Sequence, residues 1–157
     1  PDSWAFEDFV VGEELSFGRW DVTKEDIFEF GRTFDPQPFH VSEETAEASQ
    51  IGRLIASGYH TCALLMKLAA DNMLGGIYGS GSPGLEDVRF LKMVVPGDTL
   101  TGRMVCLSKR ELKSKPGIGL MHLNMALVDA DGGDVITWDT HVLRRLRSGM
   151  AAQPGGI

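Results

Sequence analysis

Residues 57–73 read SGYHTCALLMKLAADNM, and this stretch decides the fold. Apolar or small side chains occur nearly all round the helix that it would form, while the few polar ones, His60, Lys67 and Asp71, fall roughly along one stripe. A helix that is apolar on most sides is buried on most sides. The stretch therefore predicts a central helix with other parts of the chain wrapped around it.

The second half of the chain supplies the elements that would wrap such a helix. Turn signals, among them PGD at residues 96–98 and DGG at residues 131–133, separate four segments of strand character. Within residues 118–130 apolar side chains at alternate positions are separated by others that point the opposite way, as in a strand with one buried face. Because the connections are short, we expect antiparallel pairing. The predicted strands cover residues 85–95, 98–112, 118–130 and 135–146, with a fifth at residues 14–22.

Length and composition indicate one domain. The chain has 157 residues, which is enough for one hydrophobic core and too few for two comfortable ones. We therefore predict an α+β fold, with a curved antiparallel sheet around the long central helix, in a single domain over residues 1–147. Residues 148–157 are predicted to be a flexible C-terminal tail.

Charge and cysteine usage exclude several classes of protein. The formal net charge of −7 argues against a protein that binds nucleic acid or an anionic membrane surface. No apolar run approaches the roughly 20 residues of a membrane-spanning helix. Cys62 and Cys106 lie in apolar contexts and outside any C-x-x-C pair. We therefore predict neither a disulfide framework nor structural zinc, and a reducing, cytoplasmic setting.

Two helical segments flank a proline-containing loop in the first half. Thr23 followed by Asp26 is a helix-start signal for residues 24–34, and Ser42 begins a short acidic helix. Between them lies DPQPFH, residues 35–40. Two prolines in six residues predict that this segment is loop.

Asp35 and His40 are the candidate catalytic pair in that loop. Pro36 and Pro38 restrict the backbone between them, so both side chains can face one pocket. A carboxylate and an imidazole can share a water molecule and transfer its protons, which is general acid–base chemistry. The alternative is structural, because an Asp before a proline often caps a turn and a histidine in a loop often has no function.

Ser57 and Gly58 stand where the central helix is expected to begin. The N–H groups of a first helical turn lack intrahelical partners and lie at the positive end of the helix dipole, which suits an oxyanion or an enolate. Gly58 would let a ligand approach the backbone closely, although it would equally serve tight packing of the helix against a loop.

Other patterns point away from further chemistry. No two histidines have a metal-ligand spacing on one predicted helix or strand, so no metal site is predicted. The G-x-G-x-x-G at residues 79–84 follows a helix and precedes a strand, which is the reverse of the dinucleotide-binding order. Ser57 lacks the flanking glycines of a nucleophile elbow.

Together these residues resemble the MaoC-like dehydratase family, hot-dog-fold relatives of (R)-specific enoyl-CoA hydratases. Residues 35–40 match the Asp, Pro and His of a family motif of the form G-D-x-N-P-x-H. Ser57-Gly58 matches the start of the central helix, and VVPGDTL at residues 94–100 resembles the V-x-P-G-D-x-L link between strands. The resemblance covers about residues 7–146.

The chain departs from the family pattern at three positions. Phe34, Gln37 and Ser57 stand where the family commonly has Gly, Asn and His. The pair Asp35 and His40 is kept. The departures bear on acyl-chain specificity more than on reaction type.

The resemblance implies reversible hydration of a trans-2-enoyl-CoA to a 3-hydroxyacyl-CoA. Asp35 and His40 would hold and polarise the water, and the Gly58 amide would bind the thioester oxygen. No metal or redox cofactor is implied, because coenzyme A is part of the substrate. The resemblance also implies a homodimer or larger homo-oligomer. Two alternatives stay open, a hot-dog acyl-CoA thioesterase and a non-catalytic acyl-CoA-binding subunit.

Four residues are weaker candidates for substrate contact. Ser57 and His60 would border the pocket at the start of the helix. Lys109 and Arg110 belong to a group of four cations at residues 109–115. For this group, a site for the CoA phosphates and a solvated hairpin end are both open.

Overall fold

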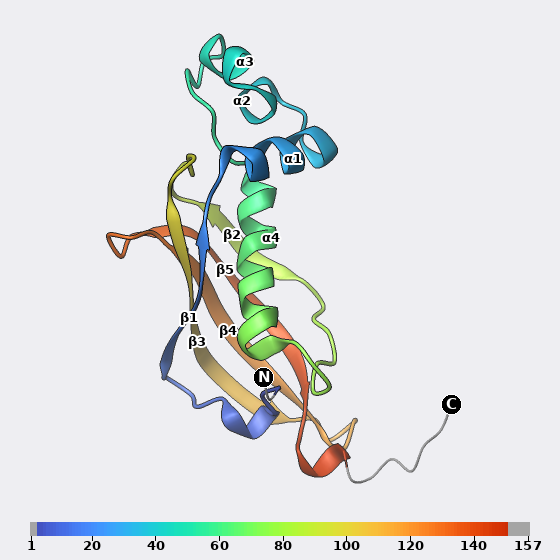
Figure 1. Ribbon diagram of the computed structural model, residues 1–157. Coiled ribbons are helices and arrows are strands. Elements are labelled where there is room, and N and C mark those ends of the chain that lie inside the picture. The colour runs from blue at the N-terminus through green and yellow to red at the C-terminus, as the bar shows by residue number, and fades with distance from the viewer. Residues whose placement is uncertain (1–2, 151–157) are drawn as a thin grey trace.

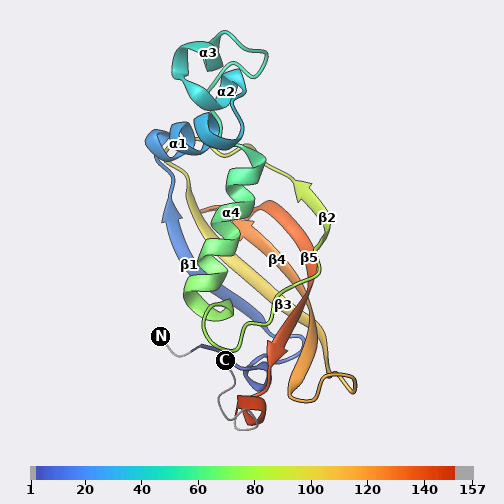
Figure 2. The same cartoon turned by 90° about the vertical axis from the view of Figure 1, so that its right-hand side faces the viewer.

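The structure is a computed structural model that describes residues 3–150. Helix α4 (Gly58–Ala69) lies along the concave side of a curved sheet of five antiparallel strands (Figures 1 and 2), as predicted. The strands are β1 (Glu14–Asp21), β2 (Leu85–Phe90), β3 (Thr99–Glu111), β4 (Ile118–Val128) and β5 (Asp134–Arg145), in the sheet order β1-β3-β4-β5-β2. The edges of the sheet are therefore β1 and β2.

Three shorter helices cluster beyond the N-terminal end of α4 (Figure 1). They are α1 (Lys24–Phe34), α2 (Pro38–Val41) and α3 (Glu43–Glu47). At its other end α4 continues into the π-helical turn η2 (Ala70–Leu74). Residues 3–150 also contain two 3₁₀ turns, η1 (Phe6–Asp8) and η3 (Ser148–Met150). None of the helices in residues 3–150 is long and apolar enough to cross a membrane.

The structure describes only the beginning of the predicted C-terminal tail, whose flexibility stays a prediction. Its first residues, Ser148–Met150, form η3, and the Gly149 N–H donates to the Leu146 carbonyl. The rest of the predicted tail, residues 151–157, lies outside the described residues.

The edge strand β2 is shorter than the predicted strand of residues 85–95. After Phe90 the chain turns out of the sheet, where the N–H groups of Leu91 and Lys92 both donate to the Val135 carbonyl. Farther along, the Val94 carbonyl accepts from the Ala56 N–H. The second half of the predicted strand therefore runs beside the segment that leads into α4.

The core lies between α4 and the inner face of the sheet. Alternate side chains of β4 point inward, as the sequence pattern predicts, and are fully buried: Met121, Leu123, Met125 and Leu127. Leu64, Leu65 and Leu68 of α4 belong to the same core cluster. Full burial of one such side chain is worth about 1.5–3 kcal/mol, so this alternation holds the helix on the sheet.

The opposite side of α4 is uncovered in the single chain. Tyr59 is 70% exposed and Met66 is 43% exposed, and Ala63 and Ala70 share this stripe. The prediction of a helix buried on most sides is therefore wrong for one chain, because the sheet reaches only one side of it. An apolar stripe on an exposed helix face is typical of an interface.

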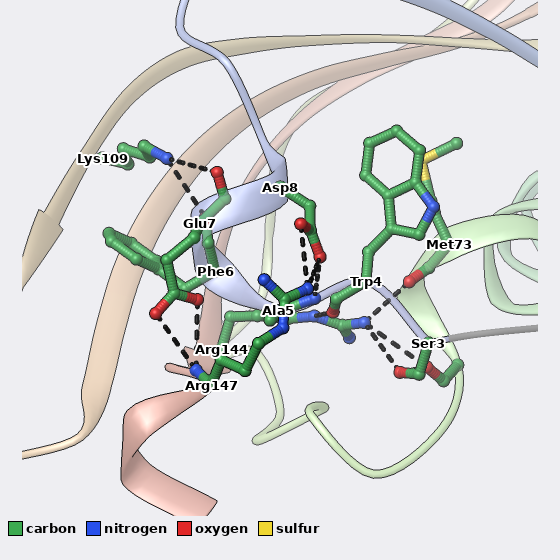
Figure 3. Close-up of polar contacts among 11 residues, drawn as sticks. Ser3, Trp4, Ala5, Phe6, Glu7, Asp8, Met73, Lys109, Arg144 and Arg147 are labelled. Atoms are coloured by element: carbon green, nitrogen blue, oxygen red, sulfur yellow. Dashed lines mark hydrogen bonds and ion pairs between the residues drawn. The ribbon is translucent and has the colours of Figure 1, made fainter.

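Arg144 ties the far end of the helix to the start of the chain (Figure 3). Its side chain is fully buried, and its guanidinium donates to the carbonyls of Trp4, Met73 and Leu74. The last two carbonyls belong to η2, at the C-terminal end of the helix. Carbonyl groups there lack intrahelical donors and lie at the negative end of the helix dipole. This cation therefore caps the helix at the end opposite to α1–α3.

Candidate active site

Helix α1 carries Asp35 at its C-terminal end. The helix begins as predicted, because the Thr23 hydroxyl accepts from the Asp26 N–H and the Asp26 carboxylate accepts from the Thr23 N–H. It ends at Asp35, whose own N–H donates to the Gly31 carbonyl at 2.9 Å. Pro36 follows and cannot continue the helical hydrogen bonding.

His40 lies in α2, so the prediction that residues 35–40 are loop is wrong for residues 38–40. Pro38 occupies the first position of this single helical turn, where its missing N–H is not needed and its fixed φ suits a helix. The turn packs closely on α1. A Cβ added at Gly31 would lie 2.8 Å from the His40 Cβ and would also clash with the His40 carbonyl oxygen.

Two hydrogen bonds join α2 to the segment that precedes α4. His40 Nδ1 lies 2.7 Å from the Ile55 carbonyl oxygen, and the Ile55 N–H donates to the Phe39 carbonyl at 3.0 Å. Because a carbonyl can only accept, Nδ1 of His40 carries a proton. In the neutral ring Nε2 therefore has its lone pair free. This nitrogen lies 3.4 Å from Asp35 Oδ2.

Both oxygens of the Asp35 carboxylate accept hydrogen bonds. The Ser57 hydroxyl donates to Oδ2 at 2.6 Å, and the Gln37 side-chain amide donates to Oδ1 at 2.8 Å. Burial raises the pKa of Asp35, but the two hydrogen bonds and the nearby His40 outweigh it, so the pKa lies below its ordinary value. Asp35 is therefore an anion at neutral pH.

A cavity of about 460 Å³ opens beside this pair. Asp35, Gln37 and His40 line it on one side, and Gly58 lies at its wall where α4 begins. The Gly58 N–H belongs to the first turn of α4, where the helix offers no acceptor. The remaining lining is mainly apolar and includes Phe39, Tyr59, Phe90, Leu91 and Met93. Such a pocket suits an apolar ligand with one polar reactive group.

Phe90 covers Gly58 from the end of β2. A Cβ added at Gly58 would lie only 2.6 Å from Cε1 of the Phe90 ring. The missing side chain thus serves close packing against the Phe90 ring. Gly58 also lines the cavity, and its contact with a ligand stays a prediction.

Two of the predicted substrate contacts lie elsewhere. Ser57 and His60 are not among the residues that line the cavity. Ser57 is buried behind Asp35. His60 is also buried, and its ring stacks on Phe30 with centroids 4.8 Å apart. Burial lowers the pKa of His60; the Asp26 carboxylate raises it to a smaller extent, and His40 lowers it further.

Lys109 and Arg110 lie at the other end of the molecule. Both residues lie near the C-terminal end of β3, which pairs with the first residues of β4. The candidate site lies near the N-terminal end of β3, at the end of the sheet where α1 and α2 are found (Figure 1). Lys109 donates to the carbonyls of Phe6 and Glu7. Within one chain the structure does not bring these cations to the cavity, so their role in binding CoA stays a prediction that needs a second copy.

Sequence reasoning did not assign roles to Gln37 and Phe90. Gln37 lies inside the predicted motif, so its position was visible while its bond to Asp35 was not. Phe90 belongs to an exposed edge strand and carried no signal. Among residues 3–150 no three His, Cys, Asp or Glu side chains are grouped so as to hold a metal ion.

Comparison with known proteins identifies the family of this chain and several of its relatives. A family model described as the MaoC like domain matches residues 8–120. An uncharacterised protein, YdeM of Bacillus subtilis (strain 168), is 32% identical over 115 residues, which are 71% of this chain and 79% of YdeM. The crystal structure of the MaoC-like dehydratase from Rhodospirillum rubrum is 30% identical, with a TM-score of 0.83 over 92% of this chain and 99% of that one.

More distant structures share the fold. The R-hydratase PhaJ1 from Pseudomonas aeruginosa is 19% identical, with a TM-score of 0.73 over 91% of this chain and 86% of that one. A conserved hypothetical protein from Mycobacterium tuberculosis with a double hot-dog fold is 16% identical, with a TM-score of 0.76 over 99% of this chain and 47% of that one. The predicted family resemblance is thus confirmed. The chain belongs to the MaoC-like dehydratase family and has the hot-dog fold.

Proposed function

We propose that the protein is an (R)-specific enoyl-CoA hydratase, or in the reverse direction a 3-hydroxyacyl-CoA dehydratase. The observation that carries the proposal is the approach of His40 Nε2 to Asp35 Oδ2, 3.4 Å apart, at the edge of a largely apolar cavity that also reaches Gly58. Membership of a dehydratase family and the fold shared with an R-hydratase support it.

The pair is suited to hold one water molecule. The lone pair on His40 Nε2 and the Asp35 carboxylate are both acceptors, so a water can donate one hydrogen to each. Its oxygen then adds to C3 of the enoyl thioester, and the proton that it loses passes to His40 and on to C2. The low pKa of Asp35 favours His40 as the group that takes this proton, because the carboxylate is the weaker base.

The start of α4 is suited to the charge that develops on the substrate. As the oxygen adds to C3, negative charge moves to the thioester oxygen of the enolate. The Gly58 N–H points from the positive end of a helix and has no partner in the helix. A donor placed where charge develops lowers the barrier more than one that binds the ground state equally.

The test is an assay of the purified protein with trans-2-enoyl-CoA esters of increasing chain length, followed by loss of the enoyl thioester absorbance. Asp35→Asn and His40→Gln should each lower kcat by about 10²-fold or more, the usual contribution of a general acid–base group. Glu29→Gln is the matched control, since Glu29 is an exposed carboxylate of α1 outside the cavity lining.

Two results would overturn the proposal. Near-full activity in folded Asp35→Asn or His40→Gln would remove the catalytic pair. Release of free CoA without loss of the double bond would indicate a thioesterase, and tight binding of acyl-CoA with neither reaction would indicate a binding subunit.

The proposal includes a second copy of the chain as the partner. The stripe of α4 with Tyr59 and Met66 is exposed, and so are the apolar side chains Leu85 and Phe90 of the edge strand β2; Tyr59 and Phe90 line the same cavity. The double hot-dog relative, of which this chain spans 47%, supports a pair of such domains as the working unit. A second copy would cover this face and enclose the cavity, to which Tyr59 and Phe90 contribute.

A further inference from the structure

Ser57 occupies an unusual place for a helix-capping residue. It is the N-cap of α4, its side chain is 1% exposed, and it does not line the cavity. Its side chain is therefore not part of the cavity wall in the single chain. Its hydroxyl nevertheless lies 2.6 Å from the Asp35 carboxylate, which does line the cavity.

The direction of this hydrogen bond follows from the second partner of the hydroxyl. The Tyr59 N–H donates to the Ser57 oxygen at 3.2 Å. A backbone N–H can only donate, so the single hydroxyl hydrogen of Ser57 is left for Asp35. Two hydrogen bonds in series therefore link α4 to Asp35: the Tyr59 N–H donates to the Ser57 hydroxyl, and this hydroxyl donates to Asp35 Oδ2. In such a chain each hydrogen bond polarises the next.

This arrangement acts on the charge of Asp35 as well as on its position. A hydroxyl that can only donate to Oδ2 stabilises the ionised carboxylate over the protonated acid at that oxygen. It also joins α1, which carries Asp35, to the positive end of α4, so that the carboxylate stays on the cavity side beside His40.

We infer that Ser57 is a positioning residue that fixes the orientation and the ionised state of Asp35 by linking its carboxylate to the N-terminus of α4. Ser57 is thus not a substrate contact. The inference concerns Asp35 in the free protein, and it rests on the proposed function only for its effect on turnover.

Other groups near Asp35 must be accounted for in a pH experiment. His40 of α2 lies beside the carboxylate, and Gln37 donates to its other oxygen. Tyr59 of α4 and Lys92, just beyond β2, line the same cavity. All of these groups remain in place when Ser57 alone is changed, so a change in the titration of Asp35 reports the lost hydroxyl.

The experiment is an NMR titration of the Asp35 side-chain carboxyl carbon in the free protein, compared with Ser57→Ala and with Ser57→Thr, which keeps the hydroxyl. The midpoint should move to higher pH in Ser57→Ala and return toward its original value in Ser57→Thr. Ser42→Ala is the matched control, because Ser42 caps α3 through the Thr45 N–H but makes no bond to Asp35. If Ser57→Ala does not fold, Ser57→Gly removes the hydroxyl at a smaller capping cost.

An unchanged midpoint in a folded variant without the hydroxyl overturns the inference, whatever the activity. A shifted midpoint in a protein without hydratase activity leaves the positioning role standing and refutes the proposed function. If both hold, the acid limb of the kcat/KM profile moves to higher pH in Ser57→Ala and not in Ser42→Ala.

Discussion

Gly31 is the residue on which the approach of α1 to α2 depends. A Cβ at this position would meet backbone and Cβ atoms of His40, and neither can move without displacing the whole turn. Gly31→Ala should therefore lower the free energy of unfolding by about 1–3 kcal/mol, as overpacking does, and should also lower kcat by moving His40 away from Asp35. Chemical denaturation and the hydration assay measure the two effects.

Gly84→Ala is the matched control for that substitution. Nothing lies within 4 Å of a Cβ added at Gly84, and its φ needs no glycine. Equal stability of the two variants, with full activity in both, would mean that α2 adapts to the added methyl group.

His60 is a buried base, and its protonation should oppose folding. Burial holds its pKa below the ordinary 6.5, so the unfolded chain takes up this proton at a higher pH than the folded chain does. The stability due to neutral His60 is therefore present above about pH 6.5 and is lost as the pH falls through the lower, folded pKa. His60→Gln should flatten the fall in unfolding free energy between about pH 7 and pH 5, as measured by urea denaturation. An equally steep fall in the variant would assign the acid sensitivity to other groups.

Single positions also show which features of the site a sequence motif can predict. Asp35 and His40 were predicted as a pair from spacing and resemblance, and the structure places them together. Ser57 and Gln37, two of the three departures from the family pattern, are the residues that donate to Asp35. A departure from the family pattern signals that a site differs, but only the tertiary structure shows which groups the substituted side chain contacts.

At the scale of elements, Arg144 of β5 decides how the distal end of α4 is held. Arg144→Leu would leave the carbonyls of Trp4, Met73 and Leu74 without their donor, and each buried, unpaired group costs about 1–3 kcal/mol. We therefore expect a large loss of unfolding free energy by denaturation, with normal turnover in the fraction that folds, because the site lies at the other end.

Arg19→Leu is the comparison for this element. Arg19 makes an exposed ion pair with Asp21 on β1, and such pairs contribute little to stability because solvent screens them. Comparable losses in both variants would show that Arg144 contributes no more than a surface charge.

The starts of α1 and α3 were more predictable than the end of β2. The starts of α1 and α3 follow from side-chain caps a few residues away in sequence, Thr23 and Ser42. The end of β2 depends on the Val135 carbonyl, which binds two N–H groups from a segment distant in sequence. A helix cap is a contact between residues close in sequence, whereas the end of a strand depends on hydrogen bonds to a neighbouring strand that can be distant in sequence.

For the whole molecule, the uncovered apolar face predicts a dimer. Met66→Glu and Leu85→Glu each place a charge on this face and should convert a dimer into a monomer, because an unpaired charge is costly to bury. Light scattering coupled to size-exclusion chromatography measures the mass. Leu107→Glu is the control, since Leu107 is comparably exposed on β3, which is not a neighbour of β2 in the sheet. A monomeric unmodified protein would contradict the prediction.

The sequence by itself determined the central helix, the antiparallel strands, the caps and the identity of the pair Asp35 and His40. Each of these follows from periodicity, from turn residues or from a short motif, all of which act over a few neighbouring residues. Only the tertiary structure decided the hydrogen bond from Ser57 to Asp35, the proton on Nδ1 of His40 and the uncovered side of α4. The first two depend on segments that folding brings within about 3 Å of one another, the range of a hydrogen bond, and the third depends on which side of α4 the sheet reaches. No local pattern encodes either.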